Sequence, residues 1–155
     1  MAFLIHGIDP ALFAPWFALS DAELAVRGAR RRIADDTSGF PCRVSLAEPE
    51  LGEELLLVPF EHHAVNTPYR GTGAIWVRRV ARAQLTVDRV PELLATRLLS
   101  LRGYDDEGMM SIAEVVDGRE LAPHLERMLD RRDVAYIHVH YAKPGCFACR
   151  VTRPR

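Results

Sequence analysis

The chain has 155 residues, 48% of them hydrophobic, which fits one globular domain that buries roughly 70% of its unfolded surface. Its formal net charge of −1 at pH 7 argues against a general nucleic-acid binder, which usually carries a basic excess on one face. No apolar run reaches the ~18 residues of a membrane span, and the first residues lack the pattern of a signal peptide. We therefore expect a single domain, 1–155, that is cytoplasmic and has neither a nucleic-acid nor a membrane partner.

The N-terminal part of the sequence predicts short helices. Asp9 and Pro10 favour a helical turn, and Pro15 prevents a longer helix. Ser20 and Glu23 have the spacing of a capping box, and Gly28 ends the predicted helix after about two turns. We therefore expect residues 1–28 to form a short helical cover.

The remaining sequence alternates between apolar runs and turn-forming residues. This pattern predicts strands over 29–34, 40–46, 54–60, 74–79, 98–102, 109–116, 134–141 and 146–151. The run 54–60 is apolar on both faces, which is typical of a strand in the middle of a sheet, and Pro59 is tolerable only near its end. Residues 105–108 form the expected turn of a hairpin.

One longer amphipathic helix follows Asp117, its predicted N-cap. Four apolar residues fall at helical spacing and form one stripe that should pack on the sheet: Leu121, Leu125, Met128 and Leu129. The predicted fold class is α+β, with a mainly antiparallel sheet, a short N-terminal helical cover and this helix packed on the sheet.

Four blocks of the chain resemble the bacterial domain-of-unknown-function family 1203. They are Gly39–Leu46, Glu61-His62 with Pro68-Tyr69-Arg70, Leu99–Arg102 through Gly108-Met109-Met110, and His138-Val139-His140 with Pro144–Ala148. The likeness covers nearly the whole chain, and it implies a small bacterial single-domain protein with no established activity. Cys149 and His63 depart from the usual pattern of the family, whose name brings no catalytic residue with it.

The last predicted hairpin carries the most chemistry. His138 and His140 should lie on one side of their strand with Tyr136, while Ile137 and Val139 face the core. A two-residue turn at 144–145 would place Cys149 opposite His140.

A loop one residue longer would instead place Ala148 opposite His140, with Cys146 and Arg150 on the face of the histidines. We expect this second register, because Phe147 and Val151 then join the core.

The two nearby cysteines raise the question of a metal or a nucleophile. H-x-H with C-x-x-C suggests zinc, but Cys146 and Cys149 would point to opposite faces of a strand, about 10 Å apart at Cα. We therefore predict free thiols, no stoichiometric zinc and no cofactor. Cys146 beside His138 or His140 could act as an activated nucleophile, although nothing in the sequence marks an oxyanion hole.

The candidate ligand-binding residues combine cationic and aromatic side chains: Arg43, His62, Tyr69, Arg70, Arg102, His138, His140 and Arg150. His62 follows the predicted central strand, where loops on a rigid scaffold commonly carry functional groups. We expect His62, Arg70, His138 and His140 to converge on one concave site. This set favours a small anionic or carboxylate-bearing ligand in a His/Arg/Tyr-lined cleft.

Two other functions remain open. One is a hydrolase or transferase whose catalytic candidates are His138, His140 and Cys146, and the other is a protein–protein interaction module. The sequence does not decide whether the protein is an enzyme, and it does not predict an oligomeric state.

Overall fold

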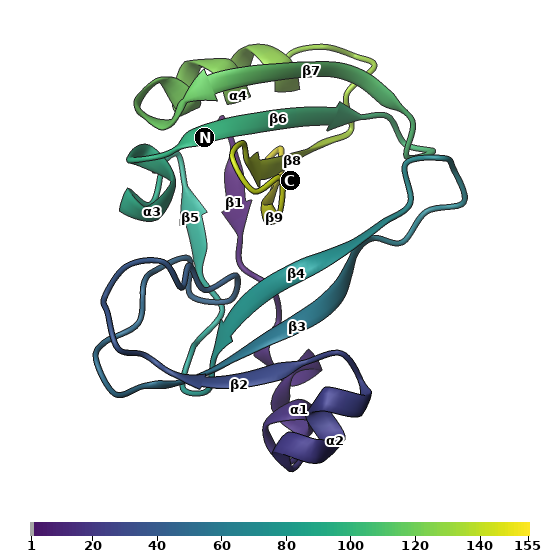
Figure 1. Ribbon diagram of the computed structural model, residues 1–155. Coiled ribbons are helices and arrows are strands. Elements are labelled where there is room, and N and C mark those ends of the chain that lie inside the picture. The colour runs from purple at the N-terminus through teal and green to yellow at the C-terminus, as the bar shows by residue number, and fades with distance from the viewer. Residues whose placement is uncertain (1) are drawn as a thin grey trace.

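The computed structural model describes residues 2–155, which form two antiparallel sheets (Figure 1). The larger sheet has the order β5-β1-β9-β8-β6-β7 and contains β1 (Leu4–His6), β5 (Leu85–Val87), β6 (Leu98–Tyr104), β7 (Met110–Asp117), β8 (Tyr136–Tyr141) and β9 (Phe147–Thr152). The smaller sheet has the order β2-β3-β4 and contains β2 (Arg30–Ile33), β3 (Glu54–His63) and β4 (Gly71–Arg78). The expected α+β class with a mainly antiparallel sheet is confirmed.

One face of the larger sheet packs against the predicted amphipathic helix, α4 (Leu121–Leu129), which follows the 3₁₀ turn η2 (Gly118–Glu120) at the top of Figure 1. All four apolar residues of the predicted stripe are buried, in one cluster with Ile137 and Val139 of β8. His138 and His140, which alternate with Ile137 and Val139 along β8, therefore point away from α4 and toward the smaller sheet.

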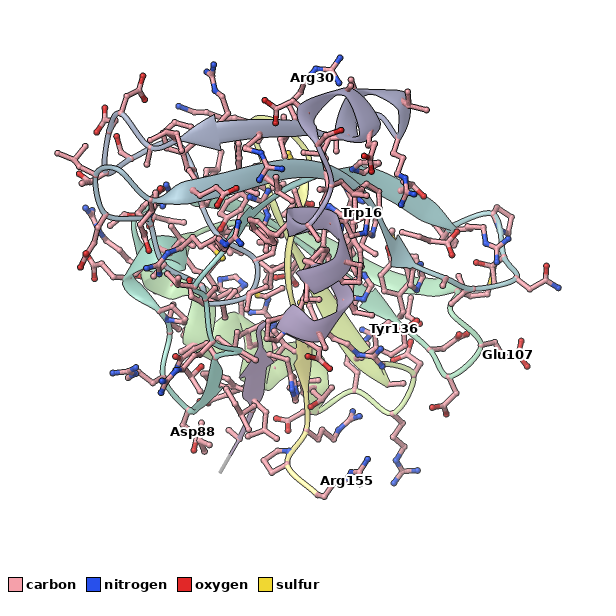
Figure 2. The ribbon with its side chains drawn as sticks, turned by 90° about the horizontal axis from the view of Figure 1, so that it is seen from below. Trp16, Arg30, Asp88, Glu107, Tyr136 and Arg155 are labelled. Atoms are coloured by element: carbon pink, nitrogen blue, oxygen red, sulfur yellow. The ribbon has the colours of Figure 1, made fainter. Side chains whose placement is uncertain are left out.

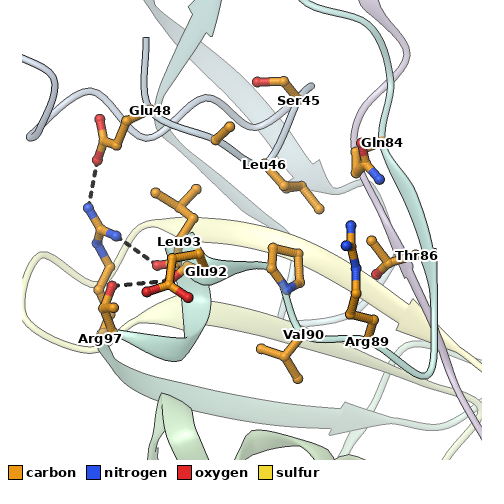
Figure 3. Close-up of a pocket in the computed structure, with 13 residues that line it drawn as sticks. Ser45, Leu46, Glu48, Gln84, Thr86, Arg89, Val90, Glu92, Leu93 and Arg97 are labelled. Atoms are coloured by element: carbon orange, nitrogen blue, oxygen red, sulfur yellow. Dashed lines mark hydrogen bonds and ion pairs between the residues drawn. The ribbon is translucent and has the colours of Figure 1, made fainter. Parts of the chain in front are cut away.

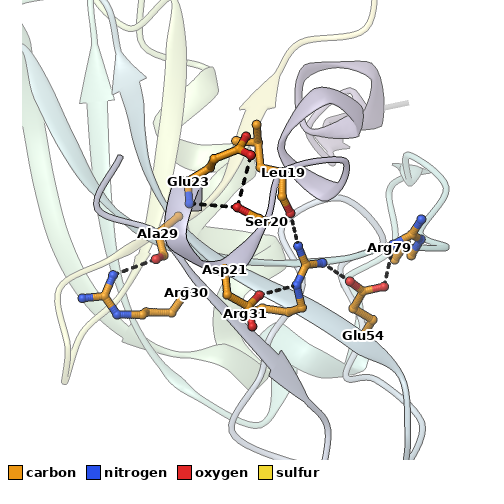
Figure 4. A network of polar contacts seen from close by, with 9 residues as sticks. All are labelled: Leu19, Ser20, Asp21, Glu23, Ala29, Arg30, Arg31, Glu54 and Arg79. Atoms are coloured by element: carbon orange, nitrogen blue, oxygen red, sulfur yellow. Dashed lines mark hydrogen bonds and ion pairs between the residues drawn. The ribbon is translucent and has the colours of Figure 1, made fainter. Parts of the chain in front are cut away.

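The N-terminal helices are η1 (Pro10–Leu12), α1 (Ala14–Phe17) and α2 (Asp21–Val26). Ser20 caps α2 as predicted, since its hydroxyl accepts the N–H of Glu23 at 3.2 Å. The Arg31 guanidinium fixes α2 to the smaller sheet by contacting Asp21, Glu54 and the Leu19 carbonyl (Figure 4). None of the helices in residues 2–155 is both long and apolar enough to cross a membrane.

Contrary to our expectation of a helical cover over 1–28, the described part of this segment, residues 2–28, is not all helical. Leu4–His6 form β1, which pairs with β5 on one side and with β9 on the other. A strand of three residues is too short to show a period of two, and its partners lie about 80 and 145 residues away in the sequence. This strand was therefore invisible to local patterning.

The prediction of a strand over 40–46 is also wrong. This segment consists of turns, with one isolated bridge from Cys42 to Trp76, and Leu46 has a positive φ of 51° that no regular strand allows. It connects the two sheets: the Arg43 N–H donates to the Trp76 carbonyl of β4, and the carbonyls of Arg43 and Val44 accept from residues 8 and 84, which lie next to β1 and β5. The short elements β5 and α3 (Glu92–Ala95) were not predicted.

The predicted strand over 54–60 is central in the smaller sheet and continues to His63. Pro59 is tolerated because β2 pairs only with residues 54–57, so β3 has a single neighbour at Pro59. The hairpin between β6 and β7 is confirmed, and Figure 2 shows Glu107 at its outer tip; Tyr136 of β8 pairs with Tyr104 at this end of the hairpin.

Candidate functional site

Three histidines meet between the two sheets. His138 and His140 extend from β8 on the face opposite α4, and His62 extends toward them from β3. One ring nitrogen of each lies within 4.8 Å of the other two. The Phe147 ring stacks on His62 with a centroid distance of 5.3 Å and an interplanar angle of 5°. We call His62, His138 and His140 the histidine cluster.

An irregularity in β3 brings His62 to this position. The pairing of β3 with β4 shifts between Glu61, opposite Thr72, and His63, opposite Gly71, so His62 is the extra residue of a β-bulge. Consecutive residues of a regular strand point to opposite faces, but a bulge re-aims a side chain. His62 and the buried His63 can therefore both contact His138.

The imidazole of His63 has both ring nitrogens hydrogen-bonded, whereas, within residues 2–155, that of His140 has only one. His63 is fully bonded: Nδ1 lies 2.8 Å from the Tyr69 carbonyl oxygen, which can only accept, and Nε2 lies 2.7 Å from the Tyr136 hydroxyl. His140 Nδ1 donates to the Gly145 carbonyl at 2.9 Å, which leaves Nε2 with the lone pair in the neutral ring.

The histidine cluster itself contains buried nitrogens with no hydrogen-bond partner among residues 2–155. They are His62 Nδ1, His138 Nδ1 and His140 Nε2. Burial is the main cause that lowers the pKa of all three, to about 2 for His138 and about 4 for His140. At neutral pH these rings are uncharged, so they offer lone pairs and N–H groups and do not supply the cationic donors that we expected.

The last hairpin follows the second, preferred register from Ile137 to Val139 and then shifts by one residue. His138 pairs with Arg150 and Val139 with Cys149, as predicted, but His140 pairs with Phe147. Ala148 is the extra residue of a bulge, which neither register anticipated. The prediction that Phe147 joins the core beside Ile137 is therefore wrong, because its ring faces the histidine cluster.

A pocket with a volume of about 540 Å³ is linked to Phe147 of the histidine face through Arg43, which lines it and donates to the Phe147 carbonyl. Its main lining residues are Arg43, Trp76, Arg97, Tyr141, Lys143 and Cys146. We call it the Arg43 pocket. Residue Arg43 is only 2% exposed, and its guanidinium donates Nε–H to the Phe147 carbonyl at 2.8 Å and Nη1–H to the Pro41 carbonyl at 2.5 Å.

No carboxylate contacts the Arg43 guanidinium within residues 2–155, so its charge is buried without an anionic partner. Burial lowers the pKa of Arg43, and its guanidinium lies 4.9 Å from the centre of the Tyr141 ring. The buried Tyr141 hydroxyl has no hydrogen-bond partner in the same part of the chain. The unbonded Tyr141 hydroxyl therefore lies next to a buried guanidinium that has no anionic partner.

A second pocket, of about 590 Å³, shares Arg97 with the first (Figure 3). Its charges are already balanced, because Arg97 donates to the Glu48 carboxylate at 2.6 Å and to the Leu93 carbonyl at 2.7 Å. Among the described residues, the second pocket thus contains no buried charge that lacks a partner, and it gives no indication of a ligand.

The other predicted ligand-binding residues are distributed as follows. Arg70 does not join the histidine cluster: its side chain is 61% exposed and forms an ion pair with Glu61. Tyr69 is also exposed, although its ring contacts that of Tyr104. Arg102 and Arg150 are the cross-strand neighbours of His138 and frame the cluster. The predicted convergence of Arg70 with the histidines is therefore wrong, whereas that of His62, His138 and His140 is confirmed.

The two cysteines of C-x-x-C lie apart from the histidine cluster. Cys146 is partly exposed and contacts Arg43, and within residues 2–155 it donates no hydrogen bond to a histidine. Cys149 is fully buried on the core face, where desolvation raises its pKa to about 12. The sequence did not predict the contributions of His63 and Phe147, because these depend on bulges in two strands, whereas Tyr136 lies beside His138 as expected.

Comparison with known proteins agrees with the resemblance of the sequence. The family described as "Protein of unknown function (DUF1203)" matches residues 39–153. No curated protein and no solved structure matches the chain. The matched range includes β3, β8 and β9, and hence every residue of the histidine cluster and of the Arg43 pocket. The chain therefore belongs to the DUF1203 family.

Proposed function

We propose that this protein binds a small anionic, carboxylate-bearing molecule in the Arg43 pocket. The observation that carries this proposal is the buried guanidinium of Arg43, which has no carboxylate partner within residues 2–155 and lines a pocket next to the unbonded Tyr141 hydroxyl. The proposed ligand belongs to the class expected from the sequence, and Arg43 is the residue that binds its carboxylate.

The energetics of Arg43 support an anionic ligand. Moving an isolated cation out of water costs several kcal/mol even after relaxation. Two neutral carbonyls and the Tyr141 ring offset part of that cost, but a carboxylate would offset more, because a guanidinium binds it with two parallel charge-assisted bonds. A ligand carboxylate would therefore supply the counter-charge that the protein lacks.

The remaining walls of the pocket suit the same ligand. Lys143 adds a positive charge at the exposed rim, whereas Trp76 and Tyr141 provide aromatic surface. The volume of about 540 Å³ falls within the range of roughly 300–1,000 Å³ that is typical of small-molecule sites.

Binding is favoured over catalysis at this site. Cys146 lines the pocket, but no histidine, aspartate or glutamate within residues 2–155 does so. A thiol nucleophile without a neighbouring general base is poorly activated. We therefore infer a binding module rather than a hydrolase or transferase that uses a His/Cys pair.

Thermal denaturation with a panel of mono-, di- and tricarboxylates and inorganic phosphate tests the proposal. A ligand present at 100 times its Kd should stabilise the fold by about 2.7 kcal/mol, which corresponds to a rise in Tm of about 5–11 °C for a chain of this size. Arg43→Met should abolish the rise, and Arg82→Met, at an exposed position outside the pocket, should leave it unchanged.

Two results would contradict the proposal. One is a panel in which no compound stabilises the wild-type protein, and the other is an equal response of Arg43→Met and wild type. If Arg43→Met does not fold, Tyr141→Phe replaces it, because this change removes the unbonded hydroxyl and keeps the ring.

A further inference from the structure

The histidine cluster is not used by the proposed anion site, yet it has the composition of a metal centre. His62, His138 and His140 form the one group of three or more potential metal ligands found in residues 2–155. The cluster joins the two sheets, and His62 precedes His138 and His140 by 76 and 78 residues in the sequence.

We propose that His62, His138 and His140 bind one divalent late transition-metal ion, such as Zn²⁺, between the two sheets. Each ring has a buried nitrogen without a hydrogen-bond partner among the described residues, at His62 Nδ1, His138 Nδ1 and His140 Nε2. A buried polar atom without a partner costs about 1–3 kcal/mol, so three such atoms together require an explanation. A shared metal ion satisfies all three.

The orientation of His140 supports this assignment. Histidines that bind a metal through one nitrogen commonly donate the other N–H to a backbone carbonyl or a carboxylate, which fixes the tautomer. His140 makes this contact with the Gly145 carbonyl through Nδ1, and it leaves Nε2 free to bind the ion.

The backbone of β4 leaves room for the His62 ring. A Cβ at residue 71 would lie 2.8 Å from Cε1 and 3.0 Å from Nε2 of His62, closer than ordinary contact allows. Gly71 has no positive φ, so its lack of a side chain serves this ring and not an unusual backbone conformation.

The donors determine the kind of metal. Three imidazoles suit Zn²⁺, Cu²⁺ and Ni²⁺, whereas Mg²⁺ and Ca²⁺ require oxygen ligands. A tetrahedral ion with Zn–N bonds of 2.0–2.1 Å places its nitrogens about 3.3 Å apart. Because one ring nitrogen of each histidine lies within 4.8 Å of a ring nitrogen of the other two, small rotations of the rings would close the site.

The positive charge of the neighbouring Arg102 further limits which metal ions can bind at the histidine cluster. Arg102 lies close enough for its charge to lower the pKa of His62 and His140, and it would also repel a cation. Metals near the top of the Irving–Williams order bind imidazole strongly enough to overcome this repulsion. An ion with three neutral ligands also keeps its whole charge, so we infer that its remaining coordination position binds an anion that Arg102 stabilises.

This site differs from the zinc site that the sequence suggested and that we expected to be absent. That argument concerned Cys146 and Cys149, which the structure separates from the histidines. The third ligand proposed here, His62, comes from the other sheet.

Calorimetric titration of the untagged, chelator-treated protein with Zn²⁺ tests the proposal. We expect one ion per chain, with binding at least 100-fold weaker in His140→Gln. Gly71→Ala should weaken binding at least tenfold by displacing the His62 ring, whereas Gly73→Ala should stay within twofold, because nothing lies within 4 Å of a Cβ at residue 73. Thermal denaturation without metal checks that each variant is folded.

Two further variants separate this site from other sources of binding. His124→Gln removes a histidine on α4 that pairs with Glu114, and Cys146→Ala removes the accessible thiol, so both should bind Zn²⁺ like the wild type. The proposal is overturned if the wild type binds no stoichiometric Zn²⁺, if Gly71→Ala and Gly73→Ala behave alike, or if Cys146→Ala abolishes binding.

Discussion

Replacing Tyr141 with phenylalanine should stabilise the ligand-free protein. The Tyr141 side chain is 4% exposed, and its hydroxyl has no hydrogen-bond partner within residues 2–155. An unsatisfied buried hydroxyl costs about 1–3 kcal/mol, and phenylalanine keeps the ring that packs against Arg43. We therefore expect Tyr141→Phe to raise the free energy of unfolding by about 1–3 kcal/mol, or the Tm by about 2–4 °C for each kcal/mol.

The same substitution should weaken ligand binding. A hydrogen bond to a charged group contributes about 1.5–3 kcal/mol, so loss of the hydroxyl should raise the Kd for a carboxylate roughly 10- to 150-fold. Higher stability with lower affinity is typical of residues that are retained for function.

Tyr136→Phe is the matched control. The Tyr136 hydroxyl is bonded to the buried Nε2 of His63 at 2.7 Å, so its removal should destabilise the fold by about 1–3 kcal/mol. Urea unfolding of the two variants and the wild type measures both effects. A less stable Tyr141→Phe protein, or changes of the same sign in both variants, would refute the reasoning.

Three further predictions concern stability and reactivity. A thiol reagent should modify Cys146 well before Cys149, whose burial raises its pKa to about 12, and equal rates in pulse labelling would contradict this. Hydrogen bonding to Arg78 lowers the pKa of Glu53 below 4.5, so part of the folding stability should be lost as the pH falls from about 4.5 through the lower, folded-state pKa. In urea unfolding at several pH values, Glu53→Gln should make the free energy of unfolding depend less on pH. An unchanged slope would count against the ion pair. Gly118→Ala should destabilise the fold by about 3 kcal/mol, because its Cβ would lie 1.9 Å from a carbonyl oxygen of α3, and an unchanged Tm would show that the backbone can separate there.

Much of the fold could be predicted because its elements have regular periods. The stripe of α4 and the alternation of β8 follow from helical and strand spacing, and both are confirmed. The strand β1 could not be found, since three residues carry no period and its partners are distant in the sequence. Residues 40–46 alternate like a strand, but their polar backbone groups bond to two different segments.

The candidate site was only partly predictable. The shared face of His138 and His140 follows from their spacing of two. The positions of His62 and Phe147 depend on bulges in β3 and β9, and an extra residue in a strand leaves no signature in a single sequence. Arg43 was proposed as a ligand residue, but its burial without a counter-charge is a tertiary property that appears only in the folded structure.

The most direct test of the anion pocket is a heteronuclear NMR titration with the carboxylate that stabilises the protein best. The buried Nε–H of Arg43, bonded to the Phe147 carbonyl, should exchange slowly enough to give its own resonance. We predict that this resonance and the amides of Cys146 and Phe147 shift together and saturate at one ligand per chain. Shifts centred instead on the second pocket, around Gln84 and Arg89, with the Arg43 resonance unmoved, would contradict the proposed function.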